Sequence, residues 1–199
     1  MARPKEFDQT STLDRAMDLF WRQGYEATSL SDLERHLGIG RQSIYDTFGT
    51  KIELYRQTLD RYSAVPVSYL LSRLEAGGAN AIHGFFQRLI DYQAQASPHA
   101  CFMVNSAVEV APRDPQVRSQ VTEHLRRLDA GFRAAFRRAQ AQGHVSASGL
   151  KDPQAAARLL TSATLGLLVA SKAGVPVDIL RQTAEALLAA VGIPKRTFS

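Results

Sequence analysis

The sequence contains a single cysteine, Cys101, and no long uninterrupted run of hydrophobic residues. One cysteine cannot form a disulfide within the chain, which disfavours the class of small secreted proteins stabilised by disulfides. The N-terminal residues lack the apolar core of a signal peptide, and the most apolar stretch, residues 159–177, is interrupted by polar residues, glycine and proline. We therefore expect no membrane span and a cytoplasmic location.

The motifs of common enzyme sites are also missing. The chain has no Gly-rich phosphate-binding loop, no Cys or His spacing typical of a zinc site and no Gly-x-Ser-x-Gly nucleophile motif. We therefore predict no metal and no cofactor. An enzyme would have to pair the Cys101 nucleophile with a histidine base, and the candidates are His83, His99, His124 and His144. No second feature supports such a pair, so an enzyme is the weaker interpretation.

The net charge is +5, but the N-terminal part of the chain has no basic excess. Residues 1–62 carry 9 Lys or Arg and 10 Asp or Glu, so the positive excess belongs to residues 63–199. The salt-dependent part of DNA affinity follows the number of phosphates neutralised and not the overall charge. Any contact with nucleic acid must therefore come from a few well-placed side chains.

Apolar residues recur with the helical period along the whole chain, and no segment alternates apolar and polar residues between hairpin turns. The predicted fold class is therefore all-α. Helices are expected at about residues 10–23, 29–37, 41–48, 50–62, 80–96, 115–142, 153–173 and 178–191, with a short segment at residues 101–110 between the fifth and sixth of them. Pro66 is expected to kink or end the fourth of these helices, because proline lacks a backbone N–H.

Several of these helices begin with recognisable capping residues. Ser29 is followed by Asp32 three residues later, and Thr50 and Glu53 form a second pair with the capping-box spacing. Two Asp-Pro pairs, at residues 114–115 and 152–153, combine an N-cap residue with proline at the first helical position. These pairs predict where the second, fourth, sixth and seventh expected helices start.

Three short helices within the first fifty residues, the last two separated by a tight turn at residues 37–40, have the arrangement of a helix-turn-helix. In such a motif the N-terminal end of the second helix of the pair reads base edges, while its inner face packs on the protein. Arg41, Gln42 and Ser43 would form the polar end, and Ile44 and Phe48 the inner face. Arginine pairs with guanine and glutamine with adenine in the major groove, so base reading is predicted there.

Residues 24–33, 38–45 and 48–51 resemble the DNA-binding signature of the TetR family almost position by position. The resemblance implies an N-terminal three-helix DNA-binding domain, residues 1–62, and a helical ligand-binding and dimerisation domain, residues 63–199. It also implies that Thr28 and Tyr45 contact phosphates and that Lys51 anchors the DNA backbone. The alternatives are that Thr28 caps the second helix, that Tyr45 is a core aromatic and that Lys51 has no specific role.

Three positions depart from the common pattern of this family. Glu34 stands where a small alanine is usual, and Gly40 stands where a serine often caps the recognition helix. Asp46 and Thr47 replace a pair that often includes histidine. These departures leave the predicted fold intact and bear on the DNA sequence preference, because Asp46 would repel phosphate if it faced DNA.

The resemblance further implies a homodimer in which the last two long helices of each chain form a four-helix bundle. Small residues among leucines allow another helix to approach closely, and the expected contact residues are Ser162, Ala163, Gly166, Ala170, Leu187 and Leu188. A homodimer would present two recognition helices to a pseudo-palindromic operator. A helical protein-interaction module that does not bind DNA is the alternative, which residues 28–51 disfavour.

Aromatic and apolar residues in the middle of the chain suggest an effector cavity, because a TetR-like ligand site would lie there. The predicted ligand-binding residues are Tyr62, Tyr69, Phe86, Leu89, Tyr92, Cys101, Phe102 and Asn105. An apolar pocket with a few polar groups suits a small organic molecule of unknown identity. The same aromatics could equally be core residues. We expect a repressor that such a molecule releases from its operator.

Cys101 opens the segment 101–115, which resembles a segment from one branch of the family. Some members of that branch use a cysteine there to sense electrophiles or oxidants, so a thiol-reactive inducer is an alternative. A nearby His99 could lower the thiol pKa if the side chains meet. The competing hypothesis is that Cys101 is a small buried hydrophobic residue.

Overall fold

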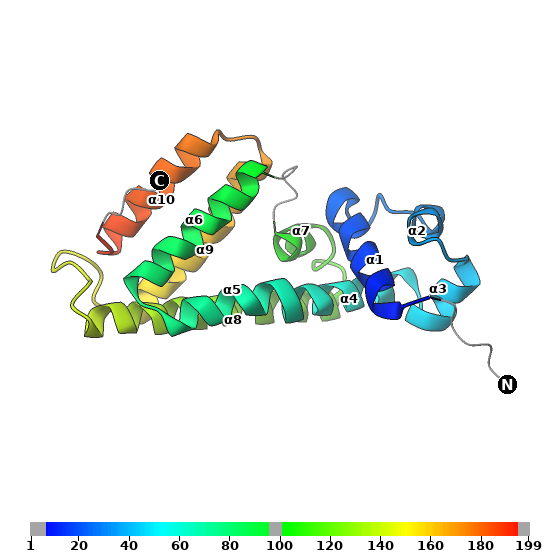
Figure 1. Cartoon of the computed structure of the whole chain (residues 1–199), viewed down its shortest axis with the longest axis horizontal. Helices are drawn as coiled ribbons and strands as arrows, with labels where there is room; N and C mark the ends of the chain where they lie inside the picture. The colour runs from blue at the N-terminus through cyan, green and yellow to red at the C-terminus, as the bar shows by residue number, and fades with distance from the viewer. Residues whose placement is uncertain (1–6, 96–100, 195–199) are drawn as a thin grey trace.

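The computed structural model describes residues 7–95 and 101–194, and every regular element in this part of the chain is a helix. The all-α fold class is therefore confirmed. In chain order (Figure 1) the elements are α1 (Gln9–Gln23), α2 (Leu30–Leu37), α3 (Arg41–Phe48), α4 (Lys51–Tyr62), the π-helical turn η1 (Ser63–Val67), α5 (Ser68–Ala76), α6 (Ala79–Gln95), α7 (Phe102–Glu109), α8 (Pro115–Ala141), α9 (Pro153–Lys172) and α10 (Val177–Ala190).

The predicted helix starts are confirmed by side-chain caps. Ser29 and Asp32 form a complete capping box at α2, and Thr50 and Glu53 form another at α4. The carboxylates of Asp114 and Asp152 accept backbone N–H groups in the first turns of α8 and α9, each of which has proline at its first position. Each cap satisfies backbone donors that a helix leaves without partners.

The prediction that the chain would kink or end at Pro66 is only partly right, because the helix continues through this residue as a π-helical turn. The turn η1 joins α4 to α5 in one rod (Figure 1), since widening the helix accommodates the missing N–H of proline. Arg127 of α8 supports the turn by donating to the hydroxyls of Ser63 at 2.8 Å and Ser68 at 2.9 Å. The expected domain boundary at residue 62 thus falls inside a continuous rod.

The helices form two groups joined by this rod and by α7 (Figure 1). The first group, α1 to α3 with the start of α4, lies at one end of the molecule. In the second group, the long helix α8 packs along α5 and against α9, while α10 packs on both α6 and α9. Helix α7 lies between the groups and contacts α4, α8 and α9.

Aromatic side chains fill the core on both sides of this junction. Tyr55 of α4 meets Phe20 of α1 edge to face with ring centroids 5.1 Å apart, and meets Phe102 of α7 at 5.4 Å. Phe86 and Phe132 stack further along, in the second group, at 5.8 Å. These buried residues belong to one contiguous core, so the two groups of helices are packed together rather than merely linked.

Candidate DNA-binding surface and effector region

Helices α2 and α3 have the geometry of a helix-turn-helix. Leu33 and Leu37 of α2 and Ile44 and Phe48 of α3 are buried, so the inner face of the pair is the one the sequence predicts. Gly38 ends α2 with φ +67°, a left-handed conformation that favours glycine and allows the sharp turn. The opposite face of α3 is left exposed.

The three predicted base-reading residues lie at the N-terminal end of α3. Arg41 and Gln42 are exposed, and Ser43 is partly exposed. Their side chains also make contacts within the protein: Arg41 Nη2 lies 3.0 Å from Glu34 Oε2, and Gln42 Nε2 donates to Asp46 Oδ1 at 2.7 Å. The position fits base reading, which remains a prediction.

The predicted phosphate anchors differ in how far they reach solvent. Tyr45 is 39% exposed and lies off the buried face of α3, so it is not a core aromatic. The Lys51 ammonium lies 4.3 Å from the centroid of the Tyr25 ring, in a cation–π contact. Partial burial lowers the pKa of Lys51, while the carboxylates of Glu26 and Glu109 act to raise it. Phosphate contact by Tyr45 and Lys51 remains a prediction.

Thr28 is fully buried in the turn between α1 and α2. Its hydroxyl donates to the carbonyl oxygen of Gly24 at 2.6 Å, and the N-cap of α2 is Ser29. The alternative that Thr28 caps α2 is therefore wrong. Its burial leaves no side-chain surface for a phosphate, so the predicted DNA contact by Thr28 is not favoured by this geometry.

Helix α7 and the loop after it contact the helix-turn-helix unit through polar groups that the sequence analysis missed. The Glu109 carboxylate accepts the backbone N–H of Tyr25 at 3.0 Å and that of Glu26 at 2.9 Å. In a second contact, buried within the core, the hydroxyls of Tyr55 and Ser106 are 2.7 Å apart. No local pattern predicts these bonds, because their partners lie more than fifty residues apart in the sequence.

A further ion pair joins α4 to the start of α8. Arg56 Nη2 lies 2.6 Å from Asp114 Oδ2, and both side chains are largely buried. The Arg56 guanidinium holds the pKa of the Asp114 carboxyl below its usual range. The sequence identified Asp114 as the cap of α8, and the structure adds that the same carboxylate fixes α8 to the DNA-binding unit.

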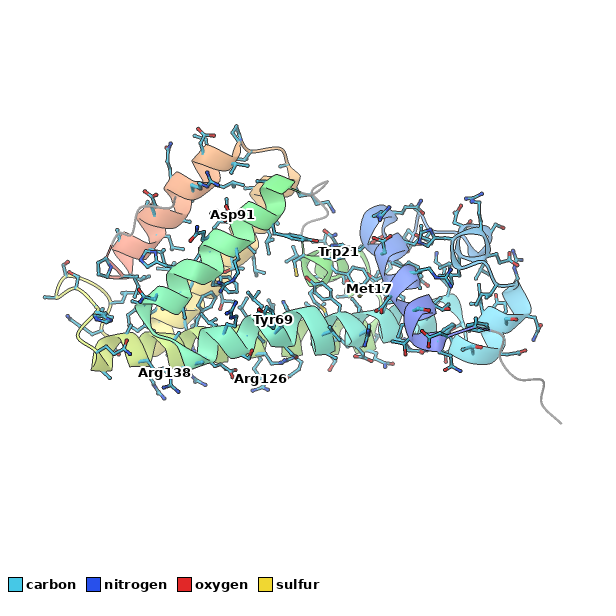
Figure 2. The ribbon with its side chains drawn as sticks, viewed as in Figure 1. Met17, Trp21, Tyr69, Asp91, Arg126 and Arg138 are labelled. Carbon is cyan, nitrogen blue, oxygen red and sulfur yellow. The ribbon has the colours of Figure 1, made fainter. Side chains whose placement is uncertain are left out.

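A groove of about 560 Å³ opens where α1, α7 and α9 meet. It is lined by Trp21, Arg22, Gln23, Gly24, Val104, Asn105, Val108, Glu109, Val169, Lys172 and Ala173. Trp21 lies near the end of α1, on the side of α7 (Figure 2). The Lys172 ammonium donates to Asn105 Oδ1 at 2.8 Å across the groove. Both groups of helices line this groove, so a bound molecule would contact both.

The predicted ligand-binding residues are not gathered around this groove, where only Asn105 is found among them. Phe86 and Phe102 are fully buried core residues, Tyr62 is buried, and Leu89 packs against the core. Tyr69 and Tyr92, by contrast, are 64% and 48% exposed. The alternative that these aromatics are plain core therefore describes Phe86 and Phe102, and Tyr69 and Tyr92 belong to the surface.

Cys101 is buried at the start of α7, where the Tyr62 hydroxyl donates to its sulfur at 3.5 Å. Burial raises the pKa of the Cys101 thiol, although the bond from Tyr62 acts in the opposite direction. The predicted influence of His99 falls outside the residues that the structure describes. This environment suits a packing residue better than a reactive thiol, and the sensing role remains a prediction.

The predicted dimer residues lie on α9 and α10. Ser162 and Gly166 are exposed, and Ala163, Ala170 and Leu187 are partly exposed. Leu188 is 1% exposed, so its predicted contact with a partner is not favoured, because its own chain already covers it. Three large apolar residues on these helices, Leu159, Val169 and Ile179, are exposed and were not predicted from the sequence.

Within residues 7–95 and 101–194, no helix is both long and apolar enough to cross a membrane. The same residues contain no group of three or more His, Cys, Asp or Glu side chains arranged to hold a metal ion. His83, one of the candidate bases, has its Nε2 2.7 Å from the carbonyl oxygen of Pro194, at the end of the described chain.

The helix-turn-helix and the helical bundle define a class of protein, the helix-turn-helix transcription regulators, and the comparisons identify the family. Residues 13–58 match the family of bacterial regulatory proteins described as the tetR family. Residues 78–187 match the tetracyclin repressor-like C-terminal domain. The chain therefore belongs to the TetR family, as the resemblance predicted. The matching families and relatives are transcriptional regulators and not enzymes.

Particular relatives cover nearly the whole chain. The uncharacterized HTH-type transcriptional regulator YezE of Bacillus subtilis is 37% identical over 186 residues, 91% of this chain and 94% of YezE. The HTH-type transcriptional repressor ComR of Escherichia coli is 28% identical over 92% of this chain and 88% of ComR. A cysteine variant of the TetR family regulator CifR, solved with 26-bp operator DNA, is 29% identical with a TM-score of 0.82, covering 94% of this chain and 99% of CifR.

Proposed function

We propose that this regulator is a repressor that binds a pseudo-palindromic operator as a homodimer and is released by a small organic effector. The observation that carries the proposal is the exposed N-terminal end of α3, held on a buried helix-turn-helix core. The relatives add support, since ComR is named a repressor and CifR was solved on operator DNA. Recognition helices on two symmetric chains would read two half-sites.

The exposed apolar side chains of α9 and α10 support the homodimer. Leu159 and Ile179 would each be removed from water by a partner, together with the small residues between them. A Cβ atom added at Gly166 would meet no other atom of the same chain within 4 Å. The surface at Gly166 therefore has space for a second helix to approach closely. A two-fold axis at this surface presents the same residues on both chains.

The groove between α1, α7 and α9 is the effector site that we propose, in place of the aromatic residues that the sequence suggested. Its volume of about 560 Å³ suits a small organic molecule, and its walls combine Trp21 and valines with Lys172 and Asn105. A ligand that binds one relative position of the two helix groups more tightly must weaken DNA binding by the same coupling free energy. A thiol-reactive inducer acting at Cys101 is the competing route.

The test is a binding titration of the full chain on the DNA that flanks its own gene. The native chain should give a specific complex that unrelated competitor DNA does not remove. Lys51→Ala should weaken binding to all sequences and reduce the salt dependence by about one phosphate contact. Arg158→Ala, at an exposed position on α9, is the matched loss of positive charge and should leave binding unchanged. Absence of any specific complex would refute the proposed function.

A further inference from the structure

The recognition helix α3 is capped from another helix. Its N-cap residue is Gly40, which has no side chain to accept a hydrogen bond, whereas α1, α2, α4, α8 and α9 each have an Asp, Ser or Thr cap. Glu34 of α2 fills the gap, because its Oε1 accepts the backbone N–H of Arg41 at 2.8 Å. The carboxylate thus satisfies a first-turn donor of α3.

The same carboxylate also holds the side chain of Arg41. Glu34 Oε2 lies 3.0 Å from Arg41 Nη2, which also donates to Ser31 Oγ at 3.3 Å. One glutamate therefore fixes both the backbone and the guanidinium of the first residue of α3. Two unusual residues of the sequence, Glu34 and Gly40, compensate for one another in this arrangement.

We propose that Glu34 is a positioning residue for DNA specificity, which acts by holding Arg41; this inference rests on the proposed function. An arginine without a partner reaches phosphates of any sequence, and that contact adds affinity without discrimination. The Glu34 carboxylate restricts Arg41 to one location and repels phosphates near it. Glu34 therefore lowers nonspecific affinity and raises the preference of the chain for its own operator.

Two variants separate the capping role of Glu34 from its hold on Arg41. In Glu34→Gln the amide oxygen can still accept the Arg41 N–H, but the charge that holds the guanidinium is gone. In Glu34→Ala with Gly40→Ser both functions of Glu34 are lost and a serine cap is restored. Serine fits at residue 40, where φ is −70° and an added Cβ meets nothing within 4 Å.

The experiment measures affinity for two DNA duplexes over a range of salt concentrations. The first duplex is the sequence that the native chain selects from a randomised duplex library, and the second is a scrambled version of it. Both variants should lower the ratio of the two affinities about tenfold, the order expected from one base contact. The salt slope should steepen by about one phosphate contact.

Controls exclude charge and folding as explanations. Asp18→Asn removes the same charge from α1, where Asp18 pairs with Arg22, and should keep the native ratio. Glu34→Ala alone should lower the thermal midpoint by about 3 °C through the lost cap, and Gly40→Ser should restore it. In an Arg41→Ala background, Glu34→Gln should have no further effect on the ratio, because the group that Glu34 holds is absent.

The outcomes distinguish this inference from the proposed function. A folded Glu34→Gln variant with the native ratio and salt slope would overturn the positioning role. So would an effect of the same size in the Arg41→Ala background, since Glu34 would then act without Arg41. A native chain that selects no sequence from the library would instead refute operator binding itself.

Discussion

The carboxylate of Glu109, the last residue of α7, accepts the backbone N–H of Tyr25 at 3.0 Å. Tyr25 lies in the turn between α1 and α2, and the neighbouring N–H of Glu26 binds the other carboxylate oxygen. Gly24 permits this approach, because its φ is +87° and an added Cβ would lie 2.9 Å from Glu109 Oε1. The bond therefore joins the groove that we propose as the effector site directly to the DNA-binding unit.

Glu109→Gln should destabilise the chain by about 1–2 kcal/mol. The neutral Gln amide has one oxygen in place of two charged ones, and its NH2 group would face one of the two backbone N–H groups that the carboxylate binds. Urea unfolding followed by circular dichroism measures the change. Glu123→Gln is the matched control, since Glu123 pairs with Arg126 at the exposed surface of α8. Equal midpoints for the Glu109 and Glu123 variants would show that the contact contributes nothing.

Sequence patterns predicted the parts of the fold that local physics determines. The capping pair Thr50 and Glu53 correctly predicted the start of α4. Ile44 and Phe48, predicted as the inner face of α3, are buried. The same patterns did not predict the Glu109 contact, because its partners lie 84 and 83 residues away in the sequence. A single glutamate at a helix end also does not indicate which group it binds. Long-range partners follow from the packing of helices and not from local spacing.

The effector prediction shows the same limit. Aromatic residues in the middle of the chain, such as Tyr69 and Phe86, suggested a single cavity, but Tyr69 is exposed at the surface and Phe86 is buried in the core. The groove instead combines residues from three separate helices, among them Trp21 and Lys172. Periodicity shows that a residue faces the core, but it does not show where packing leaves a space.

Gly166→Trp should convert the proposed dimer to a monomer. Gly166 is exposed and an added Cβ meets nothing within 4 Å, so the single chain tolerates the larger residue. A two-fold interface would meet the new side chain twice. Light scattering gives the mass, and Ser119→Trp, at an exposed position on α8, is the matched control that should remain dimeric. A folded Gly166→Trp variant with the native mass would place the interface elsewhere.

His124 should make the chain sensitive to acid. Burial lowers the pKa of this histidine to about 4, and the nearby Arg127 charge acts in the same direction. The unfolded chain binds the proton near pH 6.5, so the stability due to neutral His124 is present above that pH and is lost as the pH falls toward 4. Between pH 7.5 and pH 5 this group should remove about 2 kcal/mol.

Urea unfolding at a series of pH values tests the assignment to His124. His124→Gln should show a smaller loss of stability between pH 7.5 and pH 5 than the native chain, whatever its stability at neutral pH. His144→Gln, at an exposed position after α8, should keep the native pH dependence. If the His124 variant lost as much stability with acid as the native chain, another group would be responsible.

Cys101 should react slowly with thiol reagents in the folded chain. Its sulfur is buried beside Tyr62, and burial raises the pKa of the thiol, so little of the reactive thiolate is present at neutral pH. Alkylation by iodoacetamide, followed by mass spectrometry, should be slower by about tenfold or more than in the urea-unfolded chain at the same pH. Equal rates would mean that the thiol is accessible and would favour the sensing hypothesis.

The DNA complex separates the two roles of this cysteine. If Cys101 senses electrophiles, a thiol reagent should release the native chain from DNA and leave Cys101→Ser bound, while a reversible effector in the groove should release both. We expect the reagent to have little effect on the native complex on the timescale of effector binding, because Tyr62 and the surrounding core cover the sulfur. Release of Cys101→Ser by the same reagent would show that Cys101 is a packing residue and that the reagent acts elsewhere.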